Sequence, residues 1–233
     1  MSLDKILQSQ GFGTRKECRQ LVLGGFVRVG GDPVTYYDSV FEPEGLEFEV
    51  SEEPWIYRAK LYIALNKPSG YECSRKPSHH AGVMTLLPDQ FLARDVQAVG
   101  RLDHDTTGLL LLSDDGAFIH ALSSPKRHVP KVYVATTEAP VTDELLAQLR
   151  RGVKLHDEPA PLAAQVKQLD EQRLEIVLEQ GKYHQVKRML AAAGNQCAAL
   201  CRIAIGGLTL DALGLAEGKW CYIDPDQATR RLA

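Results

Sequence analysis

Apolar and polar residues follow two different periods at the start of the chain. Residues 3–10 carry apolar side chains at helical spacing, which predicts a first helix. Thr14 and Glu17 are spaced as a capping box and predict the start of a second helix, which a pair of glycines ends. Alternating apolar residues at 27–29 and 46–50 predict short strands. The pattern therefore predicts a helical hairpin followed by a small sheet.

Glu52-Glu53-Pro54 interrupts this pattern. Because proline and acidic residues disfavour the continuation of a strand or helix, we expect a linker here. It would separate two domains, residues 1–55 and 56–233. A chain of 233 residues is long enough for one substantial core with a small appended domain.

Strands and helices alternate in the longer second part. Four leucines at 109–112 form the kind of apolar run that fills a fully buried strand. Other strands are expected at 61–65, at 131–135, within 166–178, and at 203–210, which would close the sheet. Helices are expected to begin after Asp115, after Thr142 and near residue 185.

Composition narrows the class of protein. No run of about 18 apolar residues occurs, so no membrane span is expected, and the N-terminus lacks the pattern of an export signal. Five cysteines, an odd number without a C-x-x-C pair, favour reduced thiols in a cytoplasmic protein. Cys197 and Cys201 could share a helix face, but two thiols without further ligands make a poor zinc site, so no metal is expected.

Positive charge is concentrated near the start of the chain. The net charge of −3 argues against nucleic-acid binding through bulk charge. The first helical hairpin and the strand after it nevertheless carry Lys5, Arg15, Lys16, Arg19 and Arg28. One basic unit suits contact with an RNA backbone. The alternative is a small α/β domain with a solvated basic face.

A charged turn stands directly before the leucine strand. Arg101, Asp103 and Asp105 cluster there. Burying a charge is costly unless it is paired, and ionisable groups in unusual surroundings collect at functional sites. The turn is therefore the first candidate for a catalytic site, and an ordinary solvated turn is the alternative.

Three separated motifs resemble one enzyme family. Gly-Arg-Leu-Asp at 100–103, followed by Asp-Thr-Thr-Gly-Leu at 105–109, is similar to the active-site motif of pseudouridine synthases of the RsuA/RluA superfamily. Lys-x-Tyr at 131–133 and the basic stretch 181–189 resemble two further family motifs, in the right order. The match is nearest to the branch named for the small-subunit enzyme RsuA, which the pair His184-Gln185 also favours.

The start of the chain resembles an S4 RNA-binding domain. The similarity rests on Leu-Asp-Lys, on Thr-Arg-Lys at 14–16 and on Gly-x-Val-x-Val-x-Gly at 25–31. The resemblances together imply an α+β fold. A small S4 domain would precede a pseudouridine synthase domain whose central, mostly antiparallel mixed sheet is flanked by helices.

The resemblance also implies a reaction, the isomerisation of a uridine to pseudouridine within 16S (small-subunit) ribosomal RNA. Asp103 matches the catalytic aspartate, Lys187 the basic position, and Tyr133 the aromatic residue against the target base. A cation beside a carboxylate favours its ionised form. The sequence leaves open whether Asp103 attacks C1′ or removes the neighbouring proton. The reaction is redox-neutral, and no cofactor is expected, in keeping with a sequence that has no P-loop or dinucleotide motif.

Further basic side chains are expected to contact RNA. In the catalytic domain they are Arg101, Lys67, Lys131, His184 and the loop residues Lys126, Arg127 and His128; in the first domain they are Lys5, Arg15, Lys16 and Arg19. Arg101 would fill the gap left by a flipped nucleotide or grip its phosphate. The expected partner is ribosomal RNA or an assembling small-subunit particle, with the protein a monomer and no membrane involved.

Three other functions are compatible with parts of the sequence. A non-enzymatic ribosome-associated protein could use the same S4 domain, although binding alone does not need a paired carboxylate and lysine. A glycoside hydrolase could use Asp103 and Asp105 as its acid pair, but few aromatic residues are available to line a sugar cleft. Within the pseudouridine synthases, large-subunit (23S) ribosomal RNA is the alternative target.

Overall fold

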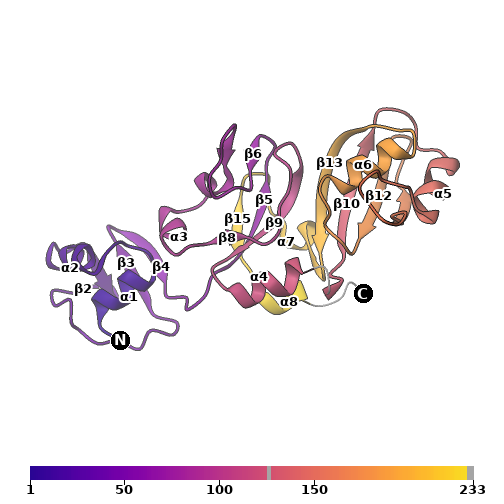
Figure 1. Ribbon diagram of the computed structural model, residues 1–233. Helices are drawn as coiled ribbons and strands as arrows, with labels where there is room; N and C mark the ends of the chain where they lie inside the picture. Colours follow the sequence, from indigo (N-terminus) through magenta and orange to yellow (C-terminus); the bar gives the residue numbers. More distant parts are fainter. Residues whose placement is uncertain (125–126, 230–233) are drawn as a thin grey trace. The chain divides into compact units, whose positions relative to one another are not determined.

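The computed structural model describes residues 1–124 and 127–229. Their contacts define two compact units, which Figure 1 colours along the chain. The first comprises Met1–Leu61 with Met84–Gln97, and the second Tyr62–Val83 with the chain from Ala98 onward. The expected boundary between residues 55 and 56 falls inside the first unit, and it stays a prediction for independently folding domains.

The first unit contains the predicted helical hairpin and a four-stranded sheet in the order β2-β1-β3-β4. Its elements are α1 (Leu3–Ser9), α2 (Arg15–Leu23), β1 (Val27–Val29), β2 (Asp32–Pro33), β3 (Glu47–Val50), β4 (Glu53–Ile56) and α3 (Asp89–Ala93). Thr14 and Glu17 form both hydrogen bonds of the predicted capping box. Leu3, Ile6 and Phe48 belong to the core between helices and sheet.

The predicted linker at residues 52–54 is wrong, because this segment is part of a β-hairpin. Ser51 and Glu52 have φ values of 53° and 70°, which suit a two-residue turn between paired strands. Pro54 then pairs with Glu49 across β3 and β4. Since β4 is an edge strand, the missing N–H of Pro54 costs no ladder hydrogen bond on the open side.

The second unit is built on one large sheet, in the order β11-β12-β10-β13-β9-β5-β15. Its strands are β5 (Tyr62–Lys67), β9 (Thr107–Ser113), β10 (Lys131–Thr137), β11 (Gln165–Gln168), β12 (Arg173–Leu178), β13 (Cys197–Ile205), β14 (Leu208–Thr209) and β15 (Trp220–Tyr222). Its helices are α4 (Gly116–Ser123), α5 (Asp143–Arg151), α6 (Gln185–Ala192), α7 (Leu210–Leu213) and α8 (Pro225–Thr229). Short elements complete the chain: β6 (Tyr71–Glu72), β7 (Ala81–Gly82), the 3₁₀ helix Val83–Leu86 and β8 (Gln97–Ala98).

The pairing confirms the expected mixed sheet. Within this order β13 and β9 are parallel, and the other neighbouring pairs for which a register is defined are antiparallel. The segment expected to close the sheet is wrong in place and extent, since β13 begins at Cys197 and lies at the centre. Gly108 permits the parallel contact: a Cβ there would lie 2.2 Å from the carbonyl oxygen of Arg202, and its φ is +99°.

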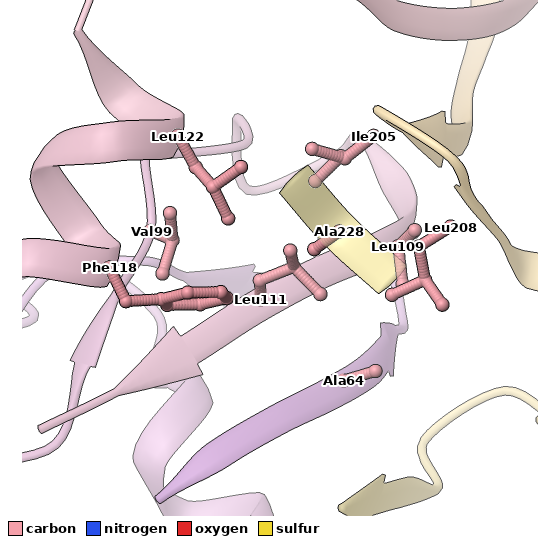
Figure 2. Packing of buried hydrophobic residues seen from close by; sticks show 9 residues of the cluster. All are labelled: Ala64, Val99, Leu109, Leu111, Phe118, Leu122, Ile205, Leu208 and Ala228. Carbon is pink, nitrogen blue, oxygen red and sulfur yellow. The ribbon is translucent and has the colours of Figure 1, made fainter. Parts of the chain in front are cut away.

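Helices α4 and α8 cover the leucine strand. Asp115 caps α4 by accepting a hydrogen bond from the Ala117 N–H, as the sequence pattern predicts. Figure 2 shows Phe118 and Leu122 of α4 on the side of Leu111, and Leu109 beside Leu208, within a cluster that also contains Ala64, Val99, Ile205 and Ala228. This packing fixes β9, and therefore the position of the charged turn that leads into it.

Candidate active site

Asp103 lies in the turn that enters β9. The N–H of Thr106 donates to the carbonyl of Asp103 at 3.1 Å and closes the turn, while Gly100 before it has a φ of 73°. The side chain of Asp103 is 25% exposed. The carboxylate is therefore held at the wall of a cleft, where a ligand can reach it.

Lys67 supports this turn through hydrogen bonds from its buried ammonium group. The expected contact between Lys67 and an RNA phosphate is wrong. Its side chain is fully buried, at the end of β5. Its Nζ donates to the carbonyls of Pro68 at 3.1 Å, His104 at 3.0 Å and Thr106 at 2.8 Å. Burial lowers the pKa of Lys67. Because three carbonyls engage the ammonium group, no donor remains for a phosphate.

Two side chains at the start of α6 contact Asp103. Lys187 Nζ lies 3.3 Å from Asp103 Oδ2 and 2.6 Å from Asp105 Oδ1, and His184 Nε2 lies 3.1 Å from Asp103 Oδ1. Burial lowers the pKa of Lys187, but the hydrogen bond that Lys187 donates to Asp105 and the charges of both aspartates outweigh it and raise the pKa. The structure thus brings the expected 103–187 pair together and adds Asp105. Their catalytic roles stay predictions.

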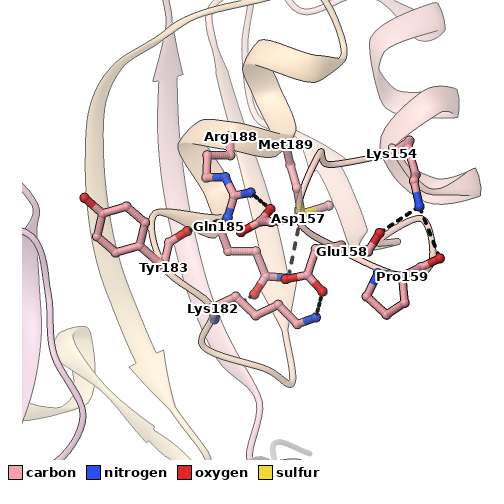
Figure 3. A network of polar contacts seen from close by, with 9 residues as sticks. All are labelled: Lys154, Asp157, Glu158, Pro159, Lys182, Tyr183, Gln185, Arg188 and Met189. Atoms are coloured by element: carbon pink, nitrogen blue, oxygen red, sulfur yellow. Dashed lines mark hydrogen bonds and ion pairs between the residues drawn. The ribbon is translucent and has the colours of Figure 1, made fainter.

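A polar network holds the turn before α6 in place. Figure 3 shows Lys182 paired with Glu158, and Arg188 paired with Asp157, across two separate segments of the chain. The side chain of Gln185 accepts a hydrogen bond from the Lys182 N–H at 3.1 Å. These contacts hold the residue between them, His184, in the left-handed region, with φ of 48° and ψ of 33°. The strained backbone turns the imidazole toward Asp103.

A pocket opens beside Asp103 and contains Tyr133. The ring belongs to β10, is 8% exposed, and lies opposite Arg202 of β13 in the sheet register. Lys131, two residues earlier on β10, lines the same pocket because residues two apart in a strand share a face. The structure therefore brings together Asp103, Tyr133 and Lys131, as the motifs predict. Arg101 is exposed and lines the pocket mouth.

Two polar groups of this pocket were not predicted from the sequence. Arg202 is 2% exposed, and its Nη2 is buried without a hydrogen-bond partner in the described part of the chain. Thr106 also lines the pocket, and its buried Oγ1 has no such partner there. A signal for Arg202 existed, since it is a charged residue inside an otherwise apolar strand, Leu200 to Ile205.

The basic residues of the first unit divide into two groups. Arg15 and Arg19 donate through Nε to the buried carboxylate of Asp4, at 2.8 and 2.9 Å, so they also stabilise the helical hairpin. Lys5 and Lys16 are exposed. Their contact with RNA stays a prediction for all four.

In the loop after α4, His128 Nδ1 lies 3.3 Å from Glu179 Oε2. Lys126, also expected there as an RNA contact, lies outside the described residues.

Within residues 1–124 and 127–229, no three His, Cys, Asp or Glu side chains cluster as a metal site would require. The five cysteines are free. Cys197 and Cys201 lie on strand β13 and therefore do not share a helix face. In the described part of the chain, no helix is both long and apolar enough to cross a membrane.

Comparison with known families defines the class. A family model for RNA pseudouridylate synthases matches residues 61–192, and a model for the S4 domain matches residues 1–40. The first match covers more than half of the chain and includes the charged turn, β10 and α6. The chain belongs to the RNA pseudouridylate synthase family and carries an S4 domain.

Individual relatives extend the likeness over nearly the whole chain. The ribosomal small subunit pseudouridine synthase A of Escherichia coli is 38% identical over 94% of this chain and 95% of its own length. An RNA pseudouridine synthase of Bacillus subtilis is 37% identical over 94% of this chain and 93% of its own. A crystal structure of a pseudouridylate synthase, 32% identical, covers 99% of both chains with a TM-score of 0.68.

Proposed function

We propose that this protein isomerises one uridine of small-subunit (16S) ribosomal RNA to pseudouridine, with Asp103 as the catalytic residue. The observation that carries the proposal is the paired carboxylate of Asp103, with Lys187 and His184 on its two oxygens, at a pocket that holds Tyr133. Family membership supports the reaction. The small-subunit target is supported by relatives such as the ribosomal small subunit pseudouridine synthase A of Salmonella typhimurium, 37% identical over 94% of this chain.

The geometry suits a nucleotide taken out of its stack. An enzyme that changes a base inside folded RNA must extrude it first. Tyr133 offers a buried ring for the uracil, and base–aromatic stacking is worth about 1–3 kcal/mol. Asp103, paired with Lys187, faces the sugar and either attacks C1′ or removes the proton from the neighbouring carbon. Arg101, exposed at the mouth of the pocket, binds the phosphate of the flipped nucleotide or fills the gap that this nucleotide leaves in the RNA.

Exchange of Asp103 for Asn tests the catalytic assignment. Asp103→Asn keeps the size and shape of the side chain but removes its charge and one acceptor oxygen, so RNA binding should persist while product formation falls below detection. Release of tritium from RNA labelled at uridine C5 measures the reaction. Asp105→Asn is the matched control, because Asp105 shares Lys187 but does not line the pocket with Tyr133. Retained isomerisation by Asp103→Asn would remove Asp103 from the mechanism.

Mapping pseudouridines in both ribosomal RNAs tests the target. In a strain without the gene, one pseudouridine should disappear from 16S RNA and return when the wild-type gene is restored. Loss of a 23S pseudouridine would replace the proposed target with the large subunit. If both maps are unchanged, ribosomal RNA is not the substrate.

The remaining parts of the proposal concern where and how the protein works. We expect a cytoplasmic monomer that needs no cofactor and acts on free ribosomal RNA or on an assembling small-subunit particle. Residues 1–55 would serve as the RNA-binding domain and residues 56–233 as the catalytic domain. Gel filtration of the purified protein, with and without RNA, tests the monomer.

A further inference from the structure

The pocket beside Asp103 ends at two cations without a neutralising carboxylate. Arg202 and Lys131 both line it, and neither has an ion pair within residues 1–124 and 127–229. The acids that also line the pocket are engaged elsewhere: Asp103 pairs with Lys187 and His184, and Glu179 with His128. Arg202 and Lys131 therefore bring positive charge to the pocket that no described ion pair neutralises.

Arg202 is held as if for a ligand. Its Nε donates to the carbonyl of Leu109 at 2.8 Å, which fixes the guanidinium against β9. Nη2 is buried and lacks a partner among the described residues, although the whole side chain is 2% exposed. A buried cation without an ion pair is unfavourable, and apolar side chains of similar size are often more stable in its place. A group retained at this cost points to function.

Lys131 brings a second positive charge to the same place. Its Nζ donates to the carbonyl of Val129 at 3.0 Å. Burial, and next the charge of Arg202, lower the pKa of Lys131 to about 8. At neutral pH most molecules therefore carry both charges, which repel each other until an electron-rich group enters the pocket.

We propose that Arg202, assisted by Lys131, binds the carbonyl oxygens of the flipped uracil and stabilises the negative charge that the ring acquires when it is detached from the ribose. Tyr133, opposite Arg202 in the sheet register, places the ring within reach of both cations. This inference rests on the proposed function, since it assigns the part of that same site that holds the leaving base.

The chemistry explains why a cation is useful here. When the N1–C1′ bond breaks, its electron pair stays on the uracil and is shared by N1 and the two carbonyl oxygens. C1′ is meanwhile bonded to Asp103, or joined to C2′ by a double bond after C2′ gives its proton to Asp103. The C5–C1′ bond then forms as Asp103 leaves or returns the proton, C5 loses its hydrogen as a proton, and N1 gains one. Both routes pass through an electron-rich ring, which fixed cations stabilise.

Substitution of Arg202 separates this role from a structural one. Arg202→Met should keep the melting temperature and RNA affinity of the wild type but lower kcat about 10²-fold or more, as loss of an oxyanion donor does. Arg202→Lys keeps the charge and should recover part of kcat. Arg150→Met is the matched control, because Arg150 also donates to one backbone carbonyl, that of Val166 at 3.0 Å, but lies outside the pocket. A kcat for Arg202→Met within threefold of wild type, or a lowered melting temperature that accounts for the loss, would overturn the proposal.

A base probe tests the pocket without the RNA target. The ring of 6-azauracil loses its proton far more readily than uracil, so it supplies the anion at pH 7.5. Wild-type protein should bind it about tenfold more tightly than uracil in an NMR titration, as a charge-assisted hydrogen bond predicts. Arg202→Met and Lys131→Met should each lose most of this preference, and an unchanged preference in both would contradict the inference. A wild-type protein that shows the preference but modifies no 16S uridine would disprove the proposed target alone.

Discussion

At the scale of single residues, buried lysine and arginine have opposite roles in this site. Lys67 has three carbonyl partners, whereas Arg202 has one and keeps a buried nitrogen without a partner among the described residues. A satisfied cation supports the fold, and an unsatisfied one is available for a ligand. Replacing each with an uncharged side chain of similar length should therefore affect different properties.

The substitution Lys67→Met should lower the stability of the fold rather than act through a lost RNA contact. It leaves the carbonyls of Pro68, His104 and Thr106 without their donor, at a cost of about 2–4 kcal/mol in the free energy of unfolding. Urea denaturation followed by tryptophan fluorescence measures the change. Lys219→Met, at an exposed lysine, is the control and should change stability by less than about 0.5 kcal/mol. Equal stability of the two variants would contradict the supporting role of Lys67.

At the scale of elements, the parallel pair of β9 and β13 decides whether the site can form. It joins the strand after Asp103 to the strand of Arg202 through a close backbone contact at Gly108. No other pair in the registered order of the large sheet is parallel. The geometry of the pocket thus depends on a residue without a side chain.

Gly108→Ala should disrupt this pair. The added Cβ would lie 2.2 Å from a backbone oxygen at a φ of +99°, so both strands must shift, and we expect a loss of about 3 kcal/mol or more. The melting temperature and the yield of folded protein report the effect. Gly116→Ala, in α4 with no atom within 4 Å of the new Cβ, should be neutral or slightly stabilising. Similar melting temperatures for Gly108→Ala and Gly116→Ala would show that β9 and β13 can move apart without a loss of stability.

Sequence patterns predicted local elements well and long-range pairings poorly. The capping box at Thr14 and the cap at Asp115 depend on neighbours in sequence, so their signals are complete in the chain. The strand at Pro54 was missed because its position at a sheet edge, which makes proline acceptable, follows from the whole sheet. The start of β13 was missed because Cys197 and Cys201 also suit a helix face.

The site shows the same division. Asp103, Tyr133 and Lys187 were predicted from the family motifs that contain them, and the structure brings Asp103 into contact with Lys187 and into one pocket with Tyr133. The contacts of Lys67 with three carbonyls and the burial of Arg202 in the pocket wall depend on the register of β5, β9 and β13. No local sequence pattern encodes that register.

At the scale of the whole molecule, the uneven charge predicts how RNA binding responds to salt. The net charge of −3 would repel RNA if it were evenly spread. Lys5 and Lys16 are exposed in the first unit, and no described ion pair engages either of them. Each phosphate contact adds about 0.9 to the slope of log affinity against log salt for duplexes and about 0.7 for single strands.

The double substitution Lys5→Ala with Lys16→Ala should reduce that slope by about 1–2 and weaken binding at low salt. Filter binding of ribosomal RNA over a series of salt concentrations measures it, and kcat at saturating RNA should stay unchanged. Lys167→Ala, at an exposed lysine of β11, is the control. A slope that does not change would exclude this face of the first unit from the RNA contact.

The order of strands in the large sheet has a consequence for synthesis. The turn that carries Asp103 is translated long before Lys187 on α6 and Arg202 on β13, and β5 gains its partner β15 later still. A nascent chain whose residues up to Asp103 have left the exit tunnel contains the S4 domain and an aspartate without its cations. Under the proposed function, the growing polypeptide therefore acquires its RNA-binding domain well before its catalytic site, which is complete only when the last strands have been translated.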